Sequence, residues 1–184
     1  PIMTKDVTSK AISQIIQPTI DEMAKRGIPY QGVLYAGFMI KDGEPKLVEY
    51  NVRFGDPECQ VLMMRLGAQA LDAMLACAKG ELNNYKLNWA DDHALTIVYA
   101  AKGYPGTYEK GSNILGLDTI SESTNIQVFH AGTKKEENNI IATGGRVLNI
   151  TARGSSLKEA HRLAYETIKK IQWENGFYRN DIGW

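Results

Sequence analysis

A polar, asparagine-rich stretch at residues 81–92 divides the chain into two parts whose apolar residues follow different patterns. The first part has long helical periodicities around one pair of extended segments. The second part has short extended segments joined by glycine-rich connections, and it ends in one amphipathic helix. The dividing stretch is the best candidate linker in the sequence. The sequence therefore predicts an α+β protein with two domains, at residues 1–83 and 84–184.

The most informative element of the first domain is a predicted β-hairpin. Residues 33–40 are apolar on both alternating faces, Asp42 and Gly43 mark a tight turn, and residues 46–54 resume an extended pattern. A strand that is apolar on both faces is typical of the centre of a sheet. We therefore expect the first strand to be central and covered on both sides.

Amphipathic periodicity and short apolar runs account for the rest of the chain. The first helix is expected to bend at Pro18, because proline cannot donate a backbone hydrogen bond. The predicted elements are helices at 4–26, 57–66, 68–80 and 157–171 and, after the linker, strands at 94–101, 127–131, 140–142 and 146–152.

Charge and cysteine content narrow the function classes. The 184 residues include 21 Lys and Arg against 21 Asp and Glu, so neither a nucleic acid nor a membrane is an expected partner. The two cysteines lack the spacing of a zinc site, and no apolar stretch approaches the roughly 20 residues that span a bilayer. We expect a cytoplasmic protein with reduced thiols. The chain begins at Pro1 without an initiator methionine, which suggests a piece of a longer polypeptide.

Three polar residues share one face of the second hairpin strand, because strand side chains alternate. They are Glu49, Asn51 and Arg53, and apolar residues occupy the other face. In an arbitrary strand such a trio faces water. Here the neighbouring strand is apolar on both faces, which favours a covered position in a cleft, where the charged groups need partners.

The chemistry of this trio suits a phosphate-binding metal site. The carboxylate of Glu49 and the amide of Asn51 present hard oxygen ligands of the kind that Mg²⁺ prefers. Arg53 offers a planar fork for a phosphate or carboxylate oxygen. The spacing alone is short and common, so it needs further support from the sequence around it.

The ten residues from Glu49 to Glu58 resemble the most specific motif of the phosphoribosylamine–glycine ligase family, also called glycinamide ribonucleotide synthetases, which are ATP-grasp enzymes of purine synthesis. The hexapeptide R-F-G-D-P-E is nearly diagnostic of that family. The resemblance extends over essentially the whole chain, through stretches at 1–4, 35–37, 103–106, 129–133, 144–148 and 181–184.

The resemblance implies a fold and a reaction. The chain would hold the later part of an ATP-grasp domain, an antiparallel sheet with helices, followed by a small α+β C-terminal domain. In the family, ATP phosphorylates the carboxylate of glycine, and the amine of 5-phosphoribosylamine attacks the acyl phosphate to give glycinamide ribonucleotide, ADP and phosphate. Glu49 and Asn51 match the family's ligands for Mg²⁺ or Mn²⁺. Arg53 is expected to steady the transferring phosphoryl group as a catalytic residue, a role inferred from its face of the strand.

Four further residues are candidate substrate contacts, each with a structural alternative. Asp56 and Glu58 bind substrate, support the next helix, or do both; Asp56 would be the N-cap and Glu58 would act through the helix dipole. Gly145 and Arg146 either form part of a phosphate-binding nest or belong to a hairpin turn between short strands.

The resemblance also predicts that the site is incomplete. The family's nucleotide clamp and N-terminal substrate domain lie upstream of the position of Pro1, so the chain is expected to need that upstream half as a partner, with ATP, glycine and 5-phosphoribosylamine as substrates. The isolated chain is expected to fold but to ligate poorly. The alternatives are a carboxylate–amine ligase with another acceptor, and a non-catalytic module that docks onto a separately encoded N-terminal half.

Overall fold

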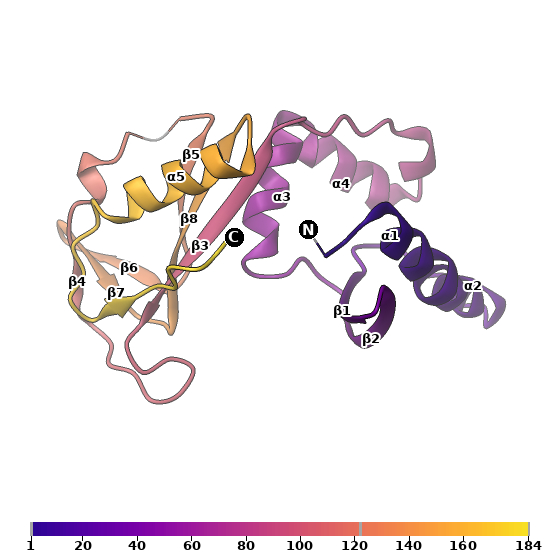
Figure 1. Cartoon of the computed structure of the whole chain (residues 1–184), viewed down its shortest axis with the longest axis horizontal. Helices are drawn as coiled ribbons and strands as arrows, with labels where there is room; N and C mark the ends of the chain where they lie inside the picture. The colour runs from indigo at the N-terminus through magenta and orange to yellow at the C-terminus, as the bar shows by residue number, and fades with distance from the viewer. Residues whose placement is uncertain (1, 122, 184) are drawn as a thin grey trace. The chain divides into compact units, whose positions relative to one another are not determined.

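The computed structural model describes residues 2–121 and 123–183, and it divides the chain into two compact units (Figure 1). Pro1 and Trp184, at the ends of two stretches that carry the family resemblance, lie outside the described residues. The first unit comprises Pro1–Gly55 and Leu71–Lys86, and the second comprises Asp56–Ala70 and Leu87–Trp184. The chain passes from the first unit to the second for the last time between Lys86 and Leu87, inside the predicted linker. The domain limits at 83 and 84 stay a prediction, because the second unit also takes in a segment from the middle of the first part.

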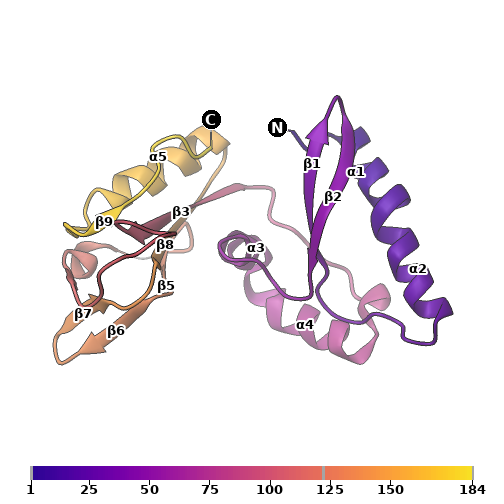
Figure 2. The same cartoon turned by 90° about the horizontal axis from the view of Figure 1, so that it is seen from below.

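The first unit contains a long helical segment, a hairpin and one further helix (Figure 2). Its elements are α1 (Lys5–Ala11), a π-helical turn (Ile12–Ile16), α2 (Gln17–Lys25), β1 (Tyr35–Lys41), β2 (Glu44–Asn51), most of α4 (Ala70–Lys79) and a 3-10 turn (Leu82–Asn84).

The ends of the first helical segment follow directly from the sequence. Thr4 caps α1, since its hydroxyl oxygen accepts a hydrogen bond from the Val7 backbone N–H at 3.3 Å. Gly27 ends α2 with a φ of 76°, a left-handed value that glycine adopts without strain. The irregularity expected at Pro18 takes the form of the π-helical turn just before it. The predicted helix at 4–26 is thus confirmed.

The predicted hairpin is confirmed, with β1 and β2 antiparallel and joined at Asp42 and Gly43. Both turn residues have positive φ, 53° and 76°, as a two-residue hairpin turn requires. The expectation that β1 is central and covered is wrong for the described chain. Its sheet there has only two strands, so both are edges, and Met39 in β1 is 66% exposed.

The helical segment packs against β2 and holds the hairpin. Val7 and Ala11 of α1 are buried. The Tyr50 hydroxyl lies 2.9 Å from the Thr19 hydroxyl and donates to the Ile15 carbonyl at 3.2 Å. The face of β2 that carries Tyr50 therefore packs against the helices. The residues before and after Tyr50 point away from the helices, because side chains alternate along a strand.

The helical run from Glu58 to Lys79 includes α3 (Glu58–Leu66), a 3-10 turn (Gly67–Gln69) and α4. The two helices predicted at 57–66 and 68–80 are confirmed. By length and composition alone the 22-residue run could cross a membrane, which differs from the expectation of no such stretch. Its few polar residues are spread along the run, so no uninterrupted apolar stretch reveals it. Core helices of soluble proteins pass the same test, and by itself the run is weak evidence for a membrane span.

The second unit is an α+β domain built on a four-stranded antiparallel sheet, with strand order β5-β8-β3-β9, and a three-stranded sheet, with order β4-β7-β6. The four strands predicted after the linker are confirmed as β3, β5, β7 and β8, and the last helix as α5. The elements after residue 90 are β3 (His93–Ala101), β4 (Asn113–Ile114), a 3-10 turn (Leu117–Thr119), β5 (Ile126–His130), β6 (Thr133–Glu136), β7 (Asn139–Ala142), β8 (Arg146–Gly154), α5 (Leu157–Ile168) and β9 (Gly176–Phe177).

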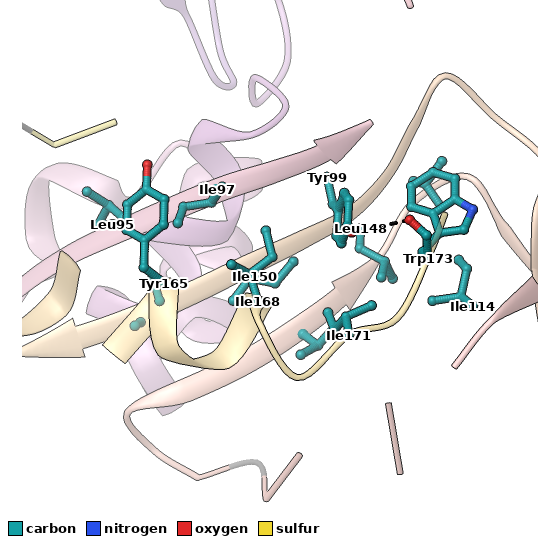
Figure 3. Packing of buried hydrophobic residues seen from close by; sticks show 14 of the residues in the cluster. Leu95, Ile97, Tyr99, Ile114, Leu148, Ile150, Tyr165, Ile168, Ile171 and Trp173 are labelled. Atoms are coloured by element: carbon teal, nitrogen blue, oxygen red, sulfur yellow. Dashed lines mark hydrogen bonds between the residues drawn. The ribbon is translucent and has the colours of Figure 1, made fainter. Parts of the chain in front are cut away.

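Strand β8 is buried on both faces and organises the second unit. It pairs with β3 on one side and β5 on the other. Leu148 and Ile150 pack in the apolar core with residues of α5 (Figure 3). Ala152 belongs to the same core. The core continues to Tyr99 and Trp173, whose rings meet edge to face with centroids 5.1 Å apart.

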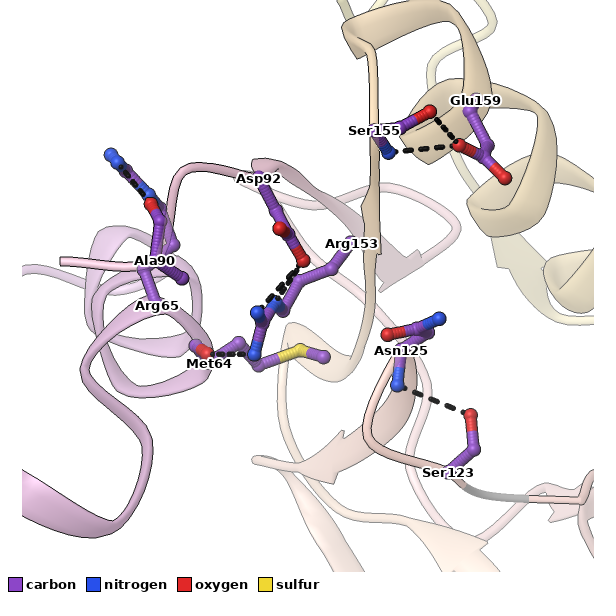
Figure 4. A network of polar contacts seen from close by, with 9 residues as sticks. All are labelled: Met64, Arg65, Ala90, Asp92, Ser123, Asn125, Arg153, Ser155 and Glu159. Atoms are coloured by element: carbon purple, nitrogen blue, oxygen red, sulfur yellow. Dashed lines mark hydrogen bonds and ion pairs between the residues drawn. The ribbon is translucent and has the colours of Figure 1, made fainter.

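The opposite face of β8 is polar and contacts α3. The Arg153 guanidinium donates from Nη1 to the Met64 carbonyl at 2.8 Å (Figure 4). It also binds the Asp92 carboxylate, at 3.1 Å from Nε and 2.8 Å from Nη2. The Arg153 side chain is only 19% exposed, so these partners hold a largely buried charge.

We predict that Arg153→Ala lowers the free energy of unfolding by about 1–3 kcal/mol, because Asp92 and the Met64 carbonyl lose a charged donor. Urea unfolding followed by tryptophan fluorescence measures this. The control is Arg162→Ala, which removes an exposed ion pair with Glu166 within α5 and should cost less than about 0.5 kcal/mol. Equal losses in the two variants would contradict a supporting role for Arg153.

Candidate functional site

Glu49 and Asn51 lie together near the end of β2, on the face opposite Tyr50. The Asn51 side-chain amide donates from Nδ2 to Glu49 Oε1 at 3.1 Å. A β-bulge at Val48 precedes them, because the partner of β1 shifts from Glu49 to Leu47 between Gly37 and Phe38. The sequence prediction that these two side chains share a face agrees with this contact.

The expected cover over the polar trio is absent from the described part of the chain. Glu49 and Arg53 are exposed and Asn51 is partly buried. The physical reason is the two-stranded sheet, whose face opposite the helices carries no further strand among the described residues. The expectation of a covered cleft is therefore wrong for this chain taken by itself.

Arg53 lies beyond the strand on which it was expected. Strand β2 ends at Asn51, and Arg53 follows in a bend, where its Nη1 donates to the Phe54 carbonyl at 2.9 Å. The alternation of strand side chains therefore does not extend to Arg53. Its role as a catalytic cation stays a prediction.

The Glu49 and Asn51 donor set fits a hard cation that takes most of its ligands elsewhere. A carboxylate and an amide oxygen are both suitable ligands for Mg²⁺. The residues that the structure describes contain no group of three or more His, Cys, Asp or Glu side chains arranged to hold a metal. A cation here would complete its shell with phosphate oxygens and water, as Mg²⁺ commonly does.

Asp56 does not cap α3, so that alternative is wrong. The N-cap residue is Pro57, and no side chain caps the helix. The carboxylate instead contacts three side chains: Arg146 Nε lies 3.0 Å from Oδ2, and Oδ1 accepts from Gln60 Nε2 at 3.0 Å and from Asn149 Nδ2 at 3.5 Å. We call Asp56, Gln60, Arg146 and Asn149 the Asp56 cluster. A substrate contact by Asp56 stays a prediction.

Glu58 occupies the first turn of α3 and is exposed. A carboxylate at this position interacts favourably with the helix dipole. Its predicted contact with substrate is separate from this effect and stays a prediction.

Gly145 lies in the connection from β7, and Arg146 begins β8, which belongs to a different sheet from β7. The hairpin alternative is therefore wrong. Neither Gly144 nor Gly145 has positive φ, whereas a nest alternates right- and left-handed residues. Packing accounts for the missing side chain at 145, because a Cβ there would collide with the Tyr104 ring. Substrate binding by Gly145 and Arg146 stays a prediction.

Sequence reasoning missed two members of the Asp56 cluster. Gln60 is four residues after Asp56, a spacing that brings side chains to one helix face. Asn149 stands between Leu148 and Ile150 in the strand predicted at 146–152, where its neighbours are apolar. A polar residue in such a run needs a partner, and this was the available signal.

The predicted site residues fall into two groups. Glu49, Asn51 and Arg53 belong to the first unit, whereas Asp56, Glu58, Gly145 and Arg146 belong to the second. Within the second group, an ion pair joins Asp56 and Arg146.

Comparison with known families agrees with both units. Residues 1–59 match the family described as Phosphoribosylglycinamide synthetase, ATP-grasp (A) domain. Residues 94–184 match Phosphoribosylglycinamide synthetase, C domain. The fold is thus the end of an ATP-grasp domain of a ligase followed by a C domain. The chain belongs to the phosphoribosylglycinamide synthetase family.

Individual relatives extend this likeness to the full chain. It is 50% identical over 184 residues to phosphoribosylamine–glycine ligase of Rhizobium meliloti, covering 100% of this chain and 43% of that protein. It is 50% identical over 188 residues to the chloroplastic ligase of Arabidopsis thaliana, covering 100% of this chain and 35% of that protein. The crystal structure of phosphoribosylamine–glycine ligase from Thermotoga maritima superposes with a TM-score of 0.84 at 34% identity, covering 97% of this chain and 44% of that one. The chain therefore spans less than half the length of these relatives.

The Cys59 thiol reports on the Asp56 carboxylate. Burial raises the pKa of Cys59, and the negative charge of Asp56 raises it further. We predict that Asp56→Asn lowers this pKa, so that Cys59 reacts faster with iodoacetamide at pH 8, where the thiolate fraction limits the rate. Peptide mass spectrometry separates Cys59 from Cys77, whose rate is the internal control. Slower labelling of Cys59 in the variant would contradict the assigned charge effect.

Proposed function

We propose that this chain is the later part of a phosphoribosylamine–glycine ligase, which joins glycine to 5-phosphoribosylamine at the expense of ATP. The observation that carries the proposal is the contact between Glu49 and Asn51, which places a carboxylate and an amide, two side chains with hard oxygen ligands, next to each other on one strand. The likeness to ligases over the full chain supports the same reaction.

The proposed reaction has two steps. The glycine carboxylate attacks the γ-phosphorus of ATP, which breaks the bond to the β–γ bridging oxygen and releases ADP. The amine of 5-phosphoribosylamine then attacks the carbonyl carbon of glycyl phosphate, and phosphate leaves as the amide forms and the amine loses a proton. Phosphoryl transfer of this kind depends on positioning and charge neutralisation rather than on a covalent nucleophile.

Each group of predicted site residues has a separate role in this proposal. Glu49 and Asn51 would hold Mg²⁺ or Mn²⁺, which supplies positive charge next to the phosphates when bound. Arg53 would orient and neutralise the transferring phosphoryl group. Asp56, Glu58, Gly145 and Arg146 would contact substrate, with Arg146 as a donor to a phosphate or carboxylate.

The nucleotide clamp would come from the part of the relatives that this chain does not span. We expect the isolated chain to fold and to release little or no ADP in a glycine-dependent way. A partner upstream half, in the same polypeptide or supplied in trans, would complete the site. The cytoplasmic location stays a prediction, and the name of one relative places that protein in the chloroplast.

Glu49→Gln tests the metal role in the chain joined to its upstream sequence. We expect ligation, followed as ADP released from ATP, Mg²⁺, glycine and fresh 5-phosphoribosylamine, to fall at least about 100-fold, since a neutral amide binds the cation more weakly.

The matched control is Glu44→Gln, which removes another carboxylate of β2. Glu44 forms an ion pair with Lys10 at 2.6 Å on the surface. Its loss should leave ligation within about twofold, because exposed ion pairs contribute little. Unchanged activity in Glu49→Gln, or an equal fall in Glu44→Gln, would contradict the proposed metal site.

A further inference from the structure

The Asp56 cluster contains two amide side chains whose orientation is set by one carboxylate. Gln60 and Asn149 both direct their NH₂ groups at Asp56 Oδ1. A rotated amide would place its oxygen against the carboxylate oxygen, and two acceptors repel each other. The amide oxygens, Gln60 Oε1 and Asn149 Oδ1, are therefore turned away from Asp56. Both are buried without a hydrogen-bond partner among the described residues.

A β-bulge brings Arg146 to the same carboxylate. Along β8 the pairing with β3 is regular from Gly154 to Leu148 and then shifts, so that Ala100 pairs with Arg146 and Val147 is extra. Without the extra residue, Arg146 would share the face of Leu148, which lies in the apolar core. The bulge changes the alternation and allows Arg146 and Asn149 to reach Asp56 from one strand.

Asn149 is fully buried in the central strand β8, on the face opposite the apolar core. Within its side chain, only the NH₂ group has a hydrogen-bond partner among the described residues. Thr151, two residues along the same face, is also fully buried, but its hydroxyl lies 2.7 Å from the Thr96 hydroxyl. Asn149 instead directs its donor at Asp56 and leaves its own oxygen unpaired, an arrangement more typical of a functional site than of a core.

We propose that Asn149, together with Gln60, is a positioning residue that fixes the Asp56 carboxylate and thereby aims Arg146 at substrate. This inference rests on the proposed ligase function, in which Asp56 and Arg146 contact substrate. The two amides limit rotation of the carboxylate, so that Oδ2 stays directed at Arg146 Nε. Neither amide touches substrate in this scheme.

A kinetic test compares Asn149→Leu, Asp56→Asn and the double variant in the chain joined to its upstream sequence. We expect each single variant to lower kcat/KM roughly 10- to 100-fold, because a small displacement of a binding group has effects of this size. Both should raise the KM of the same substrate among ATP, glycine and 5-phosphoribosylamine. The double variant should be no worse than Asp56→Asn, since residues that act as a unit are not additive.

The matched control is Thr151→Val, which removes a buried hydrogen bond from the same face of β8 without touching Asp56. It should leave all three KM values unchanged even if it lowers the melting temperature. Additive losses in the double variant, or a KM change in Thr151→Val that equals that of Asn149→Leu, would overturn the positioning role.

A second measurement is independent of ligation and uses the chain as it stands. In ¹⁵N NMR spectra, Asn149→Leu should shift the signals of Arg146 Nε–H and of the Gln60 amide group, whereas Thr151→Val should not. Unchanged signals in Asn149→Leu would overturn the inference. If the extended wild-type chain does not ligate these substrates, the proposed function fails, and the NMR result alone decides whether Asn149 positions Asp56 and Arg146.

Discussion

The second unit depends on one constraint: strand β8 is buried on both faces, and the two faces differ in polarity. Leu148, Ile150 and Ala152 face the apolar core beneath α5, whereas Asn149, Thr151 and Arg153 alternate with them. Every polar group on the second face needs a partner, because an unpaired buried polar group is costly. Arg153 donates hydrogen bonds to the Met64 carbonyl and to Asp92, and Asn149 donates one to Asp56. The polar face of β8 therefore fixes α3 and the residues before it.

This arrangement links folding to the candidate site. Asp56, Gln60 and Met64 are spaced four residues apart and so lie on one side of the segment that leads into and along α3. Asp56 accepts hydrogen bonds from both Gln60 and Asn149, and the Met64 carbonyl accepts one from Arg153. Polar contacts with β8 are therefore made both just before α3 and near its end. A single bulge at Val147 then adds Arg146 to the cluster. The candidate substrate residues thus occupy positions that the core of the second unit already holds in place.

Local patterns in the sequence predicted most helices and strands. Residues such as Thr4, Gly27, Asp42 and Gly43 begin or end an element through hydrogen bonds and backbone angles within a few neighbouring residues. These patterns did not predict whether β1 is covered, since that depends on how many strands its sheet has. Nor did they predict that β2 ends before Arg53. The bulges in β2 and β8 were also not predicted, because an extra residue reverses which face the side chains occupy and no sequence pattern indicates it. The Asp56 cluster joins residues about ninety positions apart, so local rules suggested a cap at Asp56 where tertiary contacts prevailed.

The central claim is that this chain carries the metal strand and substrate cluster of a ligase specific for glycine and 5-phosphoribosylamine. The most direct measurement is mass spectrometry of the product formed by the chain joined to its upstream sequence, with ATP, Mg²⁺, glycine and the amine, each omitted in turn. We expect glycinamide ribonucleotide with stoichiometric ADP only when all four are present. Product formation with a different amine in place of 5-phosphoribosylamine, or no amide product in the complete mixture, would contradict the claim.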